Sequence, residues 1–399
     1  MSLDTEPAAD DPTPPVPTPP TPEPHPAPPR PEPEPAPPPE PAPPESEPEP
    51  EPEPEPAPEP APGPEPAPAP TAHRAVAAKA PSKLTAGVDL GGTKIQAVVL
   101  RDETIAGSSR VPTPQTGAPD VIEAIVQAVK DSLAEAGAPP GDLQAVGIGT
   151  PGEINAPRGE VSLASNVPGF VDPPVPLGPV VSEGLGGIPV KIGNDVRVAI
   201  LGEFRRGAGR AYKNFFGVFV GTGVGGGLIL EGKLRNGRGA AGEIGHMVVK
   251  DGGRLCGCGR KGCLEAYAGR GRMEVRAREL VKKGHKTDLF KIMEKKGRTR
   301  LSSGVWAEAL EKGDDMATQL VDDAVWALGI ALASAQNLLD VEAIMLGGGL
   351  GDRLGVGLAN RVADAMLPHL FVQDHPPAIL TTELGDYSGA VGAAVLAGG

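Results

Sequence analysis

A strand–turn–strand pattern that occurs twice is the feature that most constrains the fold of this chain. Residues 84–100 form an apolar segment, a Gly-Gly-Thr turn and a second apolar segment, and residues 215–230 repeat this order around a Gly-Thr-Gly turn. Each turn places a hydroxyl group and consecutive glycines where two strands reverse, so successive backbone N–H groups can form an anion-binding nest. Two such units predict an α/β protein of two lobes, whose turns hold a polyphosphate from opposite sides of one cleft. Neither turn has the spacing of a Walker A loop or a Rossmann motif.

The first 70 residues have a composition that fits neither lobe. They contain 33 of the 50 prolines and carry 16 acidic side chains against the single base Arg30, whereas the rest of the chain has 36 bases and 35 acids. Such a segment buries too little apolar surface to fold. We therefore expect a disordered Pro/Glu-rich tail over residues 1–82, either a solvated spacer or an anionic arm for an unknown partner. Its negative charge disfavours nucleic-acid binding.

The remaining 317 residues are too many for one small core and enough for two lobes. We expect a small lobe over residues 83–194, completed by a C-terminal helix over 387–399, and a large lobe over 195–386. Apolar spacing predicts amphipathic helices, and short apolar runs predict buried strands. Helices are expected at 120–136, 195–206, 314–338, 352–366 and 389–396, strands at 143–149, 190–192 and 341–346, and an ordered Gly/Pro-rich loop between the lobes at 159–189.

All three cysteines of the chain lie close to one histidine in residues 245–265. His246, Cys256, Cys258 and Cys263 are separated by nine, one and four residues and are interleaved with glycine, a spacing that can close a tetrahedral zinc site. Four protein ligands leave no open coordination position, so the zinc would be structural. Alternatively, the thiols are small buried hydrophobic groups. A disulfide framework is disfavoured because the number of thiols is odd and no signal peptide precedes them.

Three acidic residues are candidates for chemistry. Glu243 and Glu265 flank the thiol cluster, so a metal that fixes the cluster also fixes two carboxylates suited to a polyhydroxylated ligand. Asp195 follows a short strand, where a carboxylate can accept the proton of a hydroxyl group. Alternatively, Asp195 is the N-cap of the helix that follows and satisfies backbone N–H groups.

The sequence resembles the ROK family of sugar kinases and repressors, within the actin-like superfamily, over residues 86–399. The pattern is most similar to that of bacterial glucokinases. It implies the two-lobed actin-like, or ribonuclease H-like, sugar kinase fold. The chain departs from the family after Asp195, where Val196, Arg197, Val198 and Ile200 replace asparagine and small residues. The resemblance rests on VDLGGTK (88–94), GTPG (149–152), NVPGF (166–170), GND (193–195), GTGVGGG (221–227), EIGH (243–246) and CGCGRKGCLE (256–265).

The resemblance implies roles for individual residues. Asp195 would be the general base that takes the proton of the attacking sugar hydroxyl, and Asp89 would organise Mg²⁺ and the transferring phosphoryl group. His246 would use one ring nitrogen for zinc and the other for the sugar. The implied sugar-binding residues are Asn166, Asn194, Asp195, Glu243, His246 and Glu265. The implied ATP-binding residues are Gly91, Gly92, Thr93, Lys94, Gly221, Thr222, Gly223, Gly225, Gly347, Gly348 and Gly349.

Together these features predict an ATP-dependent hexose kinase that makes glucose 6-phosphate. Alternatives within this class are a kinase for fructose, mannose or an N-acetylhexosamine, or one that uses polyphosphate in place of ATP. A repressor would need a basic helix-turn-helix ahead of Val88, where the chain is acidic and Pro-rich. A non-catalytic sugar-binding protein is disfavoured by the presence of Asp89, Asp195 and both turns. We also expect a cytoplasmic protein without a membrane span and, from the resemblance, a homodimer.

Overall fold

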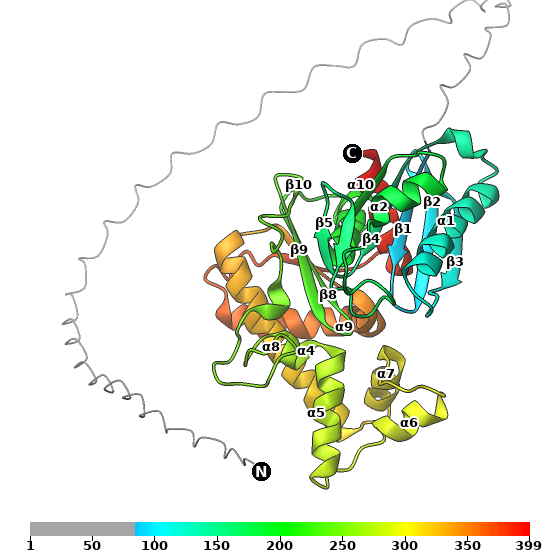
Figure 1. Ribbon diagram of the computed structural model, residues 1–399. Coiled ribbons are helices and arrows are strands. Elements are labelled where there is room, and N and C mark those ends of the chain that lie inside the picture. Colours follow the sequence, from blue (N-terminus) through cyan, green and yellow to red (C-terminus); the bar gives the residue numbers. More distant parts are fainter. Residues whose placement is uncertain (1–83) are drawn as a thin grey trace, which may run out of the picture. The chain divides into compact units, whose positions relative to one another are not determined.

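The structure is a computed structural model that describes residues 84–399, so the tail expected over residues 1–82 lies outside the described residues. Two five-stranded mixed sheets, each with its own helices, form two lobes (Figure 1). This confirms the two-lobed α/β architecture. The exact lobe boundary between residues 194 and 195 remains a prediction.

The first sheet contains the first strand–turn–strand unit. Its strand order is β3-β2-β1-β4-β7, in which β1, β2 and β3 pair antiparallel while β1, β4 and β7 are parallel. Alternate residues of β1 face opposite sides of the sheet. Leu84, Ala86, Val88 and Leu90 join the core formed with α1, whereas Gly87 faces α10. The elements are β1 (Leu84–Leu90), β2 (Lys94–Arg101), β3 (Thr104–Pro112), β4 (Leu143–Thr150), β7 (Val190–Asn194), α1 (Ala118–Glu135) and α10 (Ser388–Gly398).

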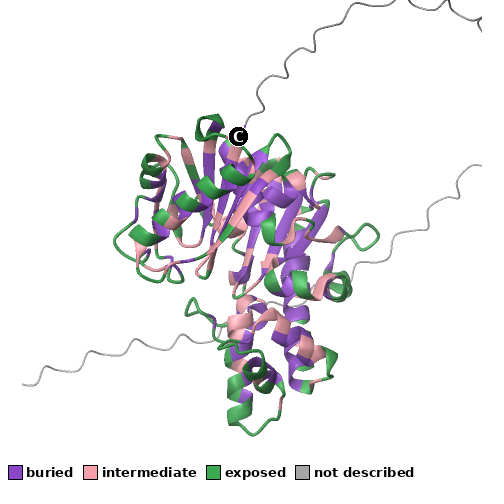
Figure 2. Cartoon of the chain, turned by 90° about the vertical axis from the view of Figure 1, so that its right-hand side faces the viewer, coloured by how far each residue is buried: buried purple, intermediate pink, exposed green. Residues whose placement is uncertain are grey.

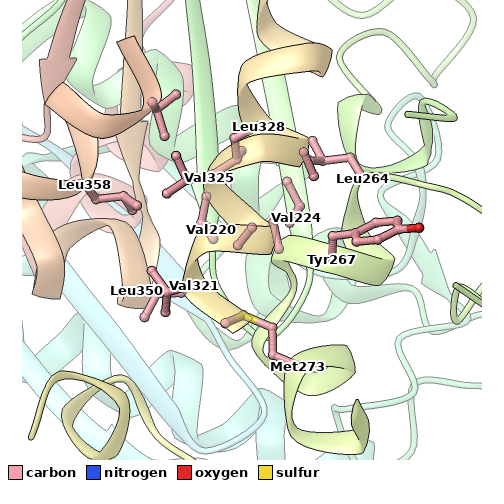
Figure 3. Close-up of a cluster of buried hydrophobic side chains, with 14 of the residues drawn as sticks. Val220, Val224, Leu264, Tyr267, Met273, Val321, Val325, Leu328, Leu350 and Leu358 are labelled. Atoms are coloured by element: carbon pink, nitrogen blue, oxygen red, sulfur yellow. The ribbon is translucent and has the colours of Figure 1, made fainter. Parts of the chain in front are cut away.

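The second sheet contains the second unit and has the order β10-β9-β8-β11-β12. Helices α8 and α9 cover one of its faces and α3 covers the other. Figure 3 shows the cluster on the first of these faces, where Val220 and Val224, at the two ends of the second turn, meet Leu328 of α8 and Leu350 of α9. The elements are β8 (Phe215–Val220), β9 (Val224–Leu230), β10 (Lys233–Arg235), β11 (Ala343–Gly347), β12 (Ala378–Thr381), α3 (Asp195–Arg206), α8 (Asp315–Leu339) and α9 (Gly348–Met366).

Helices α3 and α10 cross where the two lobes meet. Gly202 of α3 lies against the backbone of Ser388 and Gly392, and a Cβ atom at Gly392 would collide with the carbonyl oxygen of Val198. The two helix backbones are therefore in direct contact, which only glycine permits at this distance. Buried residues fill both sheets and the helices next to them (Figure 2).

The remaining elements are short. A two-stranded sheet, β5 (Glu153–Asn155) with β6 (Glu160–Ser162), lies near α2 (Leu177–Gly184), and a helical extension of the second lobe follows the thiol cluster (Figure 1). The extension consists of α4 (Glu265–Ala268), α5 (Arg270–Lys282), α6 (Leu289–Lys295) and α7 (Ser303–Glu311). One helix, α8, is long and apolar enough to cross a membrane by length and composition, but 67% of its apolar window is buried, as in a core helix.

The interpretation of residues 159–189 as a loop between the lobes is wrong. This segment contains β6 and α2, and its residues Val161, Leu177 and Val181 belong to the core of the first lobe. The many glycines and prolines obscured a helix of only eight residues. The other predicted helices and strands are present with small shifts in their bounds. For example, α9 begins at Gly348 rather than near Asp352, with a kink at Gly355.

Candidate active site

Asp195 lies at the junction of strand β7 and helix α3. The side chain of Asn194 accepts a hydrogen bond from the backbone N–H of Arg197 at 3.2 Å and is the N-cap of α3. Asp195 is the first helical residue, and its Oδ1 accepts from the N–H of Val196 at 2.9 Å. The N-cap role considered for Asp195 therefore belongs to its neighbour. The second carboxylate oxygen of Asp195 has no protein donor among the described residues.

Residues of both lobes surround Asp195. Gly149, at the end of β4 in the first lobe, lies close to its Cα atom, and Val196 packs against Gly225 of the second turn. The departure from the family pattern is therefore a packing change, since Val196 fills the space beside Gly225 and Val198 fills the space beside Gly149 and Gly193.

Asp89 and Asp195 are acids whose charges are disfavoured in this environment. Burial raises the pKa of Asp89 to about 6, and the nearby charge of Asp195 adds to this shift while Lys94 opposes it. Burial also raises the pKa of Asp195, and the charge of Glu243 acts in the same direction. Asp195 thus lies within electrostatic range of both Asp89 and Glu243. A divalent cation at this place would relieve their repulsion, so the residues fit a Mg²⁺ site.

The first glycine turn is held in place by its neighbours. The N–H of Gly91 donates to the carbonyl of Lys94 at 3.0 Å, and the hydroxyl of Thr113 donates to the carbonyl of Gly91 at 2.6 Å. Lys94 forms an ion pair with Asp386 at 3.3 Å, while the Thr93 side chain is exposed. The backbone of Asn166 lies directly against Gly92, which has no room for a side chain. Asn166 is exposed beside the first turn, on the side of the first lobe.

The second glycine turn rests on the start of helix α5. The N–H of Gly221 donates to the carbonyl of Gly223 at 2.9 Å, and the N–H of Arg270 donates to the carbonyl of Gly221 at 3.0 Å. The guanidinium group of Arg270 donates to the hydroxyl of Thr222 at 3.3 Å. Its Nη2 also lies near Gly349 of the third glycine segment. Arg270 therefore joins two segments that the sequence predicted to bind one nucleotide.

Arg270 was not predicted from the sequence. Burial lowers the pKa of its guanidinium group, and the nearby charge of Arg300 lowers it further. Its Nε is buried and has no hydrogen-bond partner among the described residues. A partly buried cation with an unpaired donor beside two glycine segments is suited to binding an anion. The only sequence signal for Arg270 was its place after a glycine at the start of a helix. An arginine in such a place is ordinarily solvated.

The three thiols and the histidine come together as predicted. The ligand atoms of His246, Cys256, Cys258 and Cys263 all lie within 4.8 Å of one another. The Sγ atoms of Cys258 and Cys263 are 3.8 Å apart, and Nδ1 of His246 is 3.9 Å from Sγ of Cys256. Zinc–sulfur bonds of about 2.3 Å at tetrahedral angles place two sulfur atoms about 3.8 Å apart, so the cluster fits zinc in its donor set and its dimensions.

Glu265 connects the thiol cluster to the second turn. Its Oε2 accepts from the N–H of Val224 at 3.1 Å, and its Oε1 lies 3.6 Å from Sγ of Cys256. Any side chain at Gly223 would collide with this carboxylate. On the other side of the cluster, Gly245 packs against the carbonyl of Val224, so Glu243 and His246 are held at the start of β9.

The chain was compared with known proteins. The model of the ROK family matches residues 85–399. The chain belongs to the ROK family. It is 35% identical over 321 residues to the glucokinase of Streptomyces coelicolor. The aligned region covers 79% of this chain and 97% of that protein. It is 32% identical to the N-acetyl-D-glucosamine kinase of Haemophilus influenzae, covering 78% of this chain and 98% of that protein.

A solved structure shows the same architecture. The ROK family glucokinase of Streptomyces griseus, in complex with glucose and AMPPNP, matches with a TM-score of 0.65 at 33% identity, over 79% of this chain and 99% of that one. The resemblance inferred from the motifs and the predicted fold class are thereby confirmed. The chain has the fold of a ROK sugar kinase.

The shifted pKa of Asp89 leads to a prediction about stability. Ionisation of this buried acid penalises the folded state progressively from about pH 4 to about pH 6, because its pKa rises from 3.8 to about 6 on folding. In Mg²⁺-free buffer, Asp89→Asn should therefore stabilise the protein at pH 8, by on the order of 2–3 kcal/mol, and less at pH 5. Urea unfolding at both pH values measures this. A gain that is equal at the two pH values would contradict the assigned cause.

Proposed function

We propose that this protein is an ATP-dependent hexose kinase that converts glucose to glucose 6-phosphate. The observation that carries the proposal is the environment of Asp195, a desolvated carboxylate with one oxygen free of protein donors. Its neighbour Val196 contacts Gly225 of β9, and its charge acts on Asp89 of the first lobe. The similarity to a glucokinase at 35% identity supports glucose as the substrate.

Asp195 is the general base in this proposal. It accepts the proton of the attacking hydroxyl group as the bond to phosphorus forms, and its raised pKa makes it a stronger base than an exposed aspartate. The hydrogen bond from the N–H of Val196 to Oδ1 fixes the carboxylate and leaves Oδ2 for the sugar. Asn194 holds the start of α3, while its amide nitrogen is available to donate to a sugar hydroxyl.

The remaining sugar contacts come from the segment around the thiol cluster. Glu243 and Glu265 accept hydrogen bonds from sugar hydroxyls, the remaining ring N–H of His246 donates to a sugar oxygen, and Asn166 contacts the sugar from the first lobe. We propose a structural zinc ion held by His246 Nδ1 and the three thiolates, which leaves the other ring nitrogen of His246 for the sugar. Zinc would fix the positions of the side chains that bind the substrate.

The phosphate groups of ATP bind between the two turns. The backbone N–H groups of residues 91–94 and 221–225 surround them, Gly347, Gly348 and Gly349 lie at the adenosine, and Arg270 neutralises negative charge from the side of the second lobe. Asp89 would hold Mg²⁺, which would neutralise charge on the phosphate oxygens when bound. Phosphoryl transfer requires little more from a protein than positioning and charge neutralisation.

The bounds of the lobes and the cellular location of the protein also belong to the proposal. The lobes comprise residues 83–194 with 387–399, and residues 195–386. Cysteines that serve as zinc ligands suit a reducing compartment, and we propose a cytoplasmic location. The homodimer implied by the family remains a prediction.

An N-acetylhexosamine kinase is the second candidate. It is favoured by the 32% identity to the N-acetyl-D-glucosamine kinase of Haemophilus influenzae, which is close to the identity with the glucokinases. Hexoses that differ by one hydroxyl or acetamido group are discriminated by whether that group forms hydrogen bonds with the side chains of the sugar site.

An ADP-release assay over a panel of hexoses tests the function. Glucose should give the highest kcat/KM, above fructose, mannose, N-acetylglucosamine and N-acetylmannosamine. Asp195→Asn should lower kcat by about 10²–10⁴-fold, because the general base is lost while the fold is kept. Asp142→Asn, an exposed aspartate at the start of β4, is the matched control and should retain activity. If Asp195→Asn keeps more than a few per cent of the turnover, Asp195 is not the base.

A second prediction concerns zinc. The purified protein should contain close to one zinc ion per chain, and Cys258→Ser should lose it, because an exposed serine is a poor ligand for this ion. The KM for glucose should rise in this variant, since His246 and Glu265 lose a fixed neighbour. Lys261→Ala, which removes an exposed charge of the same loop, is the control and should keep its zinc. Metal analysis alongside kinetics gives the result; unchanged glucose affinity after zinc loss would refute the positioning role.

A third prediction concerns Arg270. Removing a charge-assisted hydrogen bond typically costs about 1.5–3 kcal/mol, so Arg270→Ala should raise the KM for ATP by roughly 10-fold or more and leave the KM for glucose nearly unchanged. Arg298→Ala, an exposed arginine, is the control. A change in the glucose KM of the same size as that for ATP would show that Arg270 acts on the fold of the site as a whole.

A further inference from the structure

A cavity lies next to the segment that connects His246 to Cys256. Its volume is about 560 Å³, which is in the range of small-molecule sites. Segment 250–254, α4, α5 and α8 surround it. The side chains that line it are Lys250, Arg254, Tyr267, Arg276, Asp323 and Trp326. None of them has a role in the phosphoryl transfer proposed above.

The lining carries an excess of positive charge, with three basic side chains against one acidic side chain. Arg254 pairs with Asp323, and Arg276 pairs with Glu279 of its own helix at 3.1 Å. The side chain of Lys250 forms no ion pair with the described residues. One acidic side chain does not balance three basic ones, so the lining of the cavity keeps a net positive charge that attracts an anion.

Two guanidinium donors in this wall have no acceptor. Nη1 of Arg254 and Nε of Arg276 are both buried and unpaired within the described part of the chain. Buried donors without partners are uncommon in proteins, and a rotation of either guanidinium group toward the cavity would allow a bound group to complete its hydrogen bonds. An anionic ligand with several oxygens, such as a phosphate ester, supplies such acceptors.

The cavity also has an aromatic wall. Trp326 is 40% exposed, whereas the other tryptophan of the chain, Trp306, is fully buried. The Trp326 ring meets the edge of Tyr267 at a centroid distance of 5.6 Å, and the Arg254 guanidinium lies 4.7 Å from the Tyr267 centroid. An exposed indole next to basic groups suits a ligand with both an apolar face and a negative charge. The C–H groups on one face of a pyranose ring provide that apolar face.

We propose that this cavity is a second binding site, for a hexose phosphate. The phosphate group binds Lys250, Arg254 and Arg276, and the sugar ring packs against Trp326. Binding here goes beyond the proposed catalytic function, because it requires no transfer chemistry. A product-like ligand at this place would make the site regulatory.

A short path connects this cavity to the candidate active site. The Tyr267 oxygen accepts a hydrogen bond from the backbone N–H of Arg254 at 3.1 Å, and Figure 3 shows the Tyr267 hydroxyl directed away from the core cluster. Two residues earlier on the single turn of α4, Glu265 accepts from the N–H of Val224 in the second glycine turn. A ligand that shifts Arg254 therefore changes the environment of Glu265. By linkage, the affinities at the two sites change by the same factor.

Intrinsic fluorescence tests the binding site directly, because the chain has only two tryptophans and Trp306 is in the core. Glucose 6-phosphate is titrated into the full chain in the presence of saturating glucose and without ATP. The expected result is a saturable change in emission that disappears in Trp326→Phe. Lys250→Ala should weaken the affinity by roughly 10-fold, about 1.4 kcal/mol. Lys282→Ala, which removes an exposed charge of α5 outside the cavity, should leave it unchanged.

Comparison of probes separates the outcomes. Inorganic phosphate alone and glucose alone should each bind more weakly than glucose 6-phosphate; equal affinity for inorganic phosphate would overturn the assignment to a sugar ester. Absence of a saturable change, or an unchanged affinity in Lys250→Ala, would overturn the site itself. Asp195→Asn should bind as the unmodified protein does. A failure of the proposed kinase activity and a failure of binding at this cavity would therefore give different results.

Discussion

The contact between α3 and α10 is the constraint on which the arrangement of the two lobes depends. Glycines at the crossing bring the helix backbones together, and the buried carboxylate of Glu203 on α3 completes the junction. It accepts hydrogen bonds from the hydroxyl of Ser388 at 2.7 Å and from the backbone N–H groups of Leu384 and Ala208 at 2.9 and 3.2 Å. Because a buried carboxylate is tolerated only when it is fully hydrogen-bonded, this network fixes the relative position of the helices. Asp195 lies at the start of the same helix, so the crossing that joins the lobes also positions the proposed base.

Much of the fold and of the site could be predicted because the informative residues are close together in the sequence. The Asn194–Asp195 pair follows a short apolar strand and precedes a periodic segment, which predicts both the strand and the helix start. The thiol cluster lies within one loop, so its spacing was sufficient. The helix α2 was missed because its buried face consists of only three residues, Leu177, Gly178 and Val181, inside a Gly/Pro-rich segment.

The residues that sequence analysis did not find act through contacts between distant segments. Arg270 binds Thr222, 48 positions earlier, and Asp386 pairs with both Lys94 and Arg110 of the first lobe. Nothing near Arg270 or Asp386 in the sequence distinguishes them from charged residues on a solvated face. The same holds for the cavity next to the segment that connects His246 to Cys256, which combines residues of three helices and one loop. Such positions become visible only when the packing of those elements is known.

Several electrostatic costs of the described fold lie at the residues proposed for catalysis and for ATP binding. Asp89 and Asp195 have raised pKa values because each is desolvated near other acids. Arg270 is partly buried near Arg300, and its own Nε has no hydrogen-bond partner among the described residues. A fold selected for stability alone would pair or remove these groups, as it does at Glu274, which accepts from Arg278, Arg300 and the N–H of Leu301. Asp89 and Asp195 on one side of the candidate site, and Arg270 on the other, lack the oppositely charged side chains with which the protein itself could have paired them. In the proposed function, a cation with a polyphosphate would satisfy both sides at once, so the acids and the arginine would be partnered by ligands and not by each other.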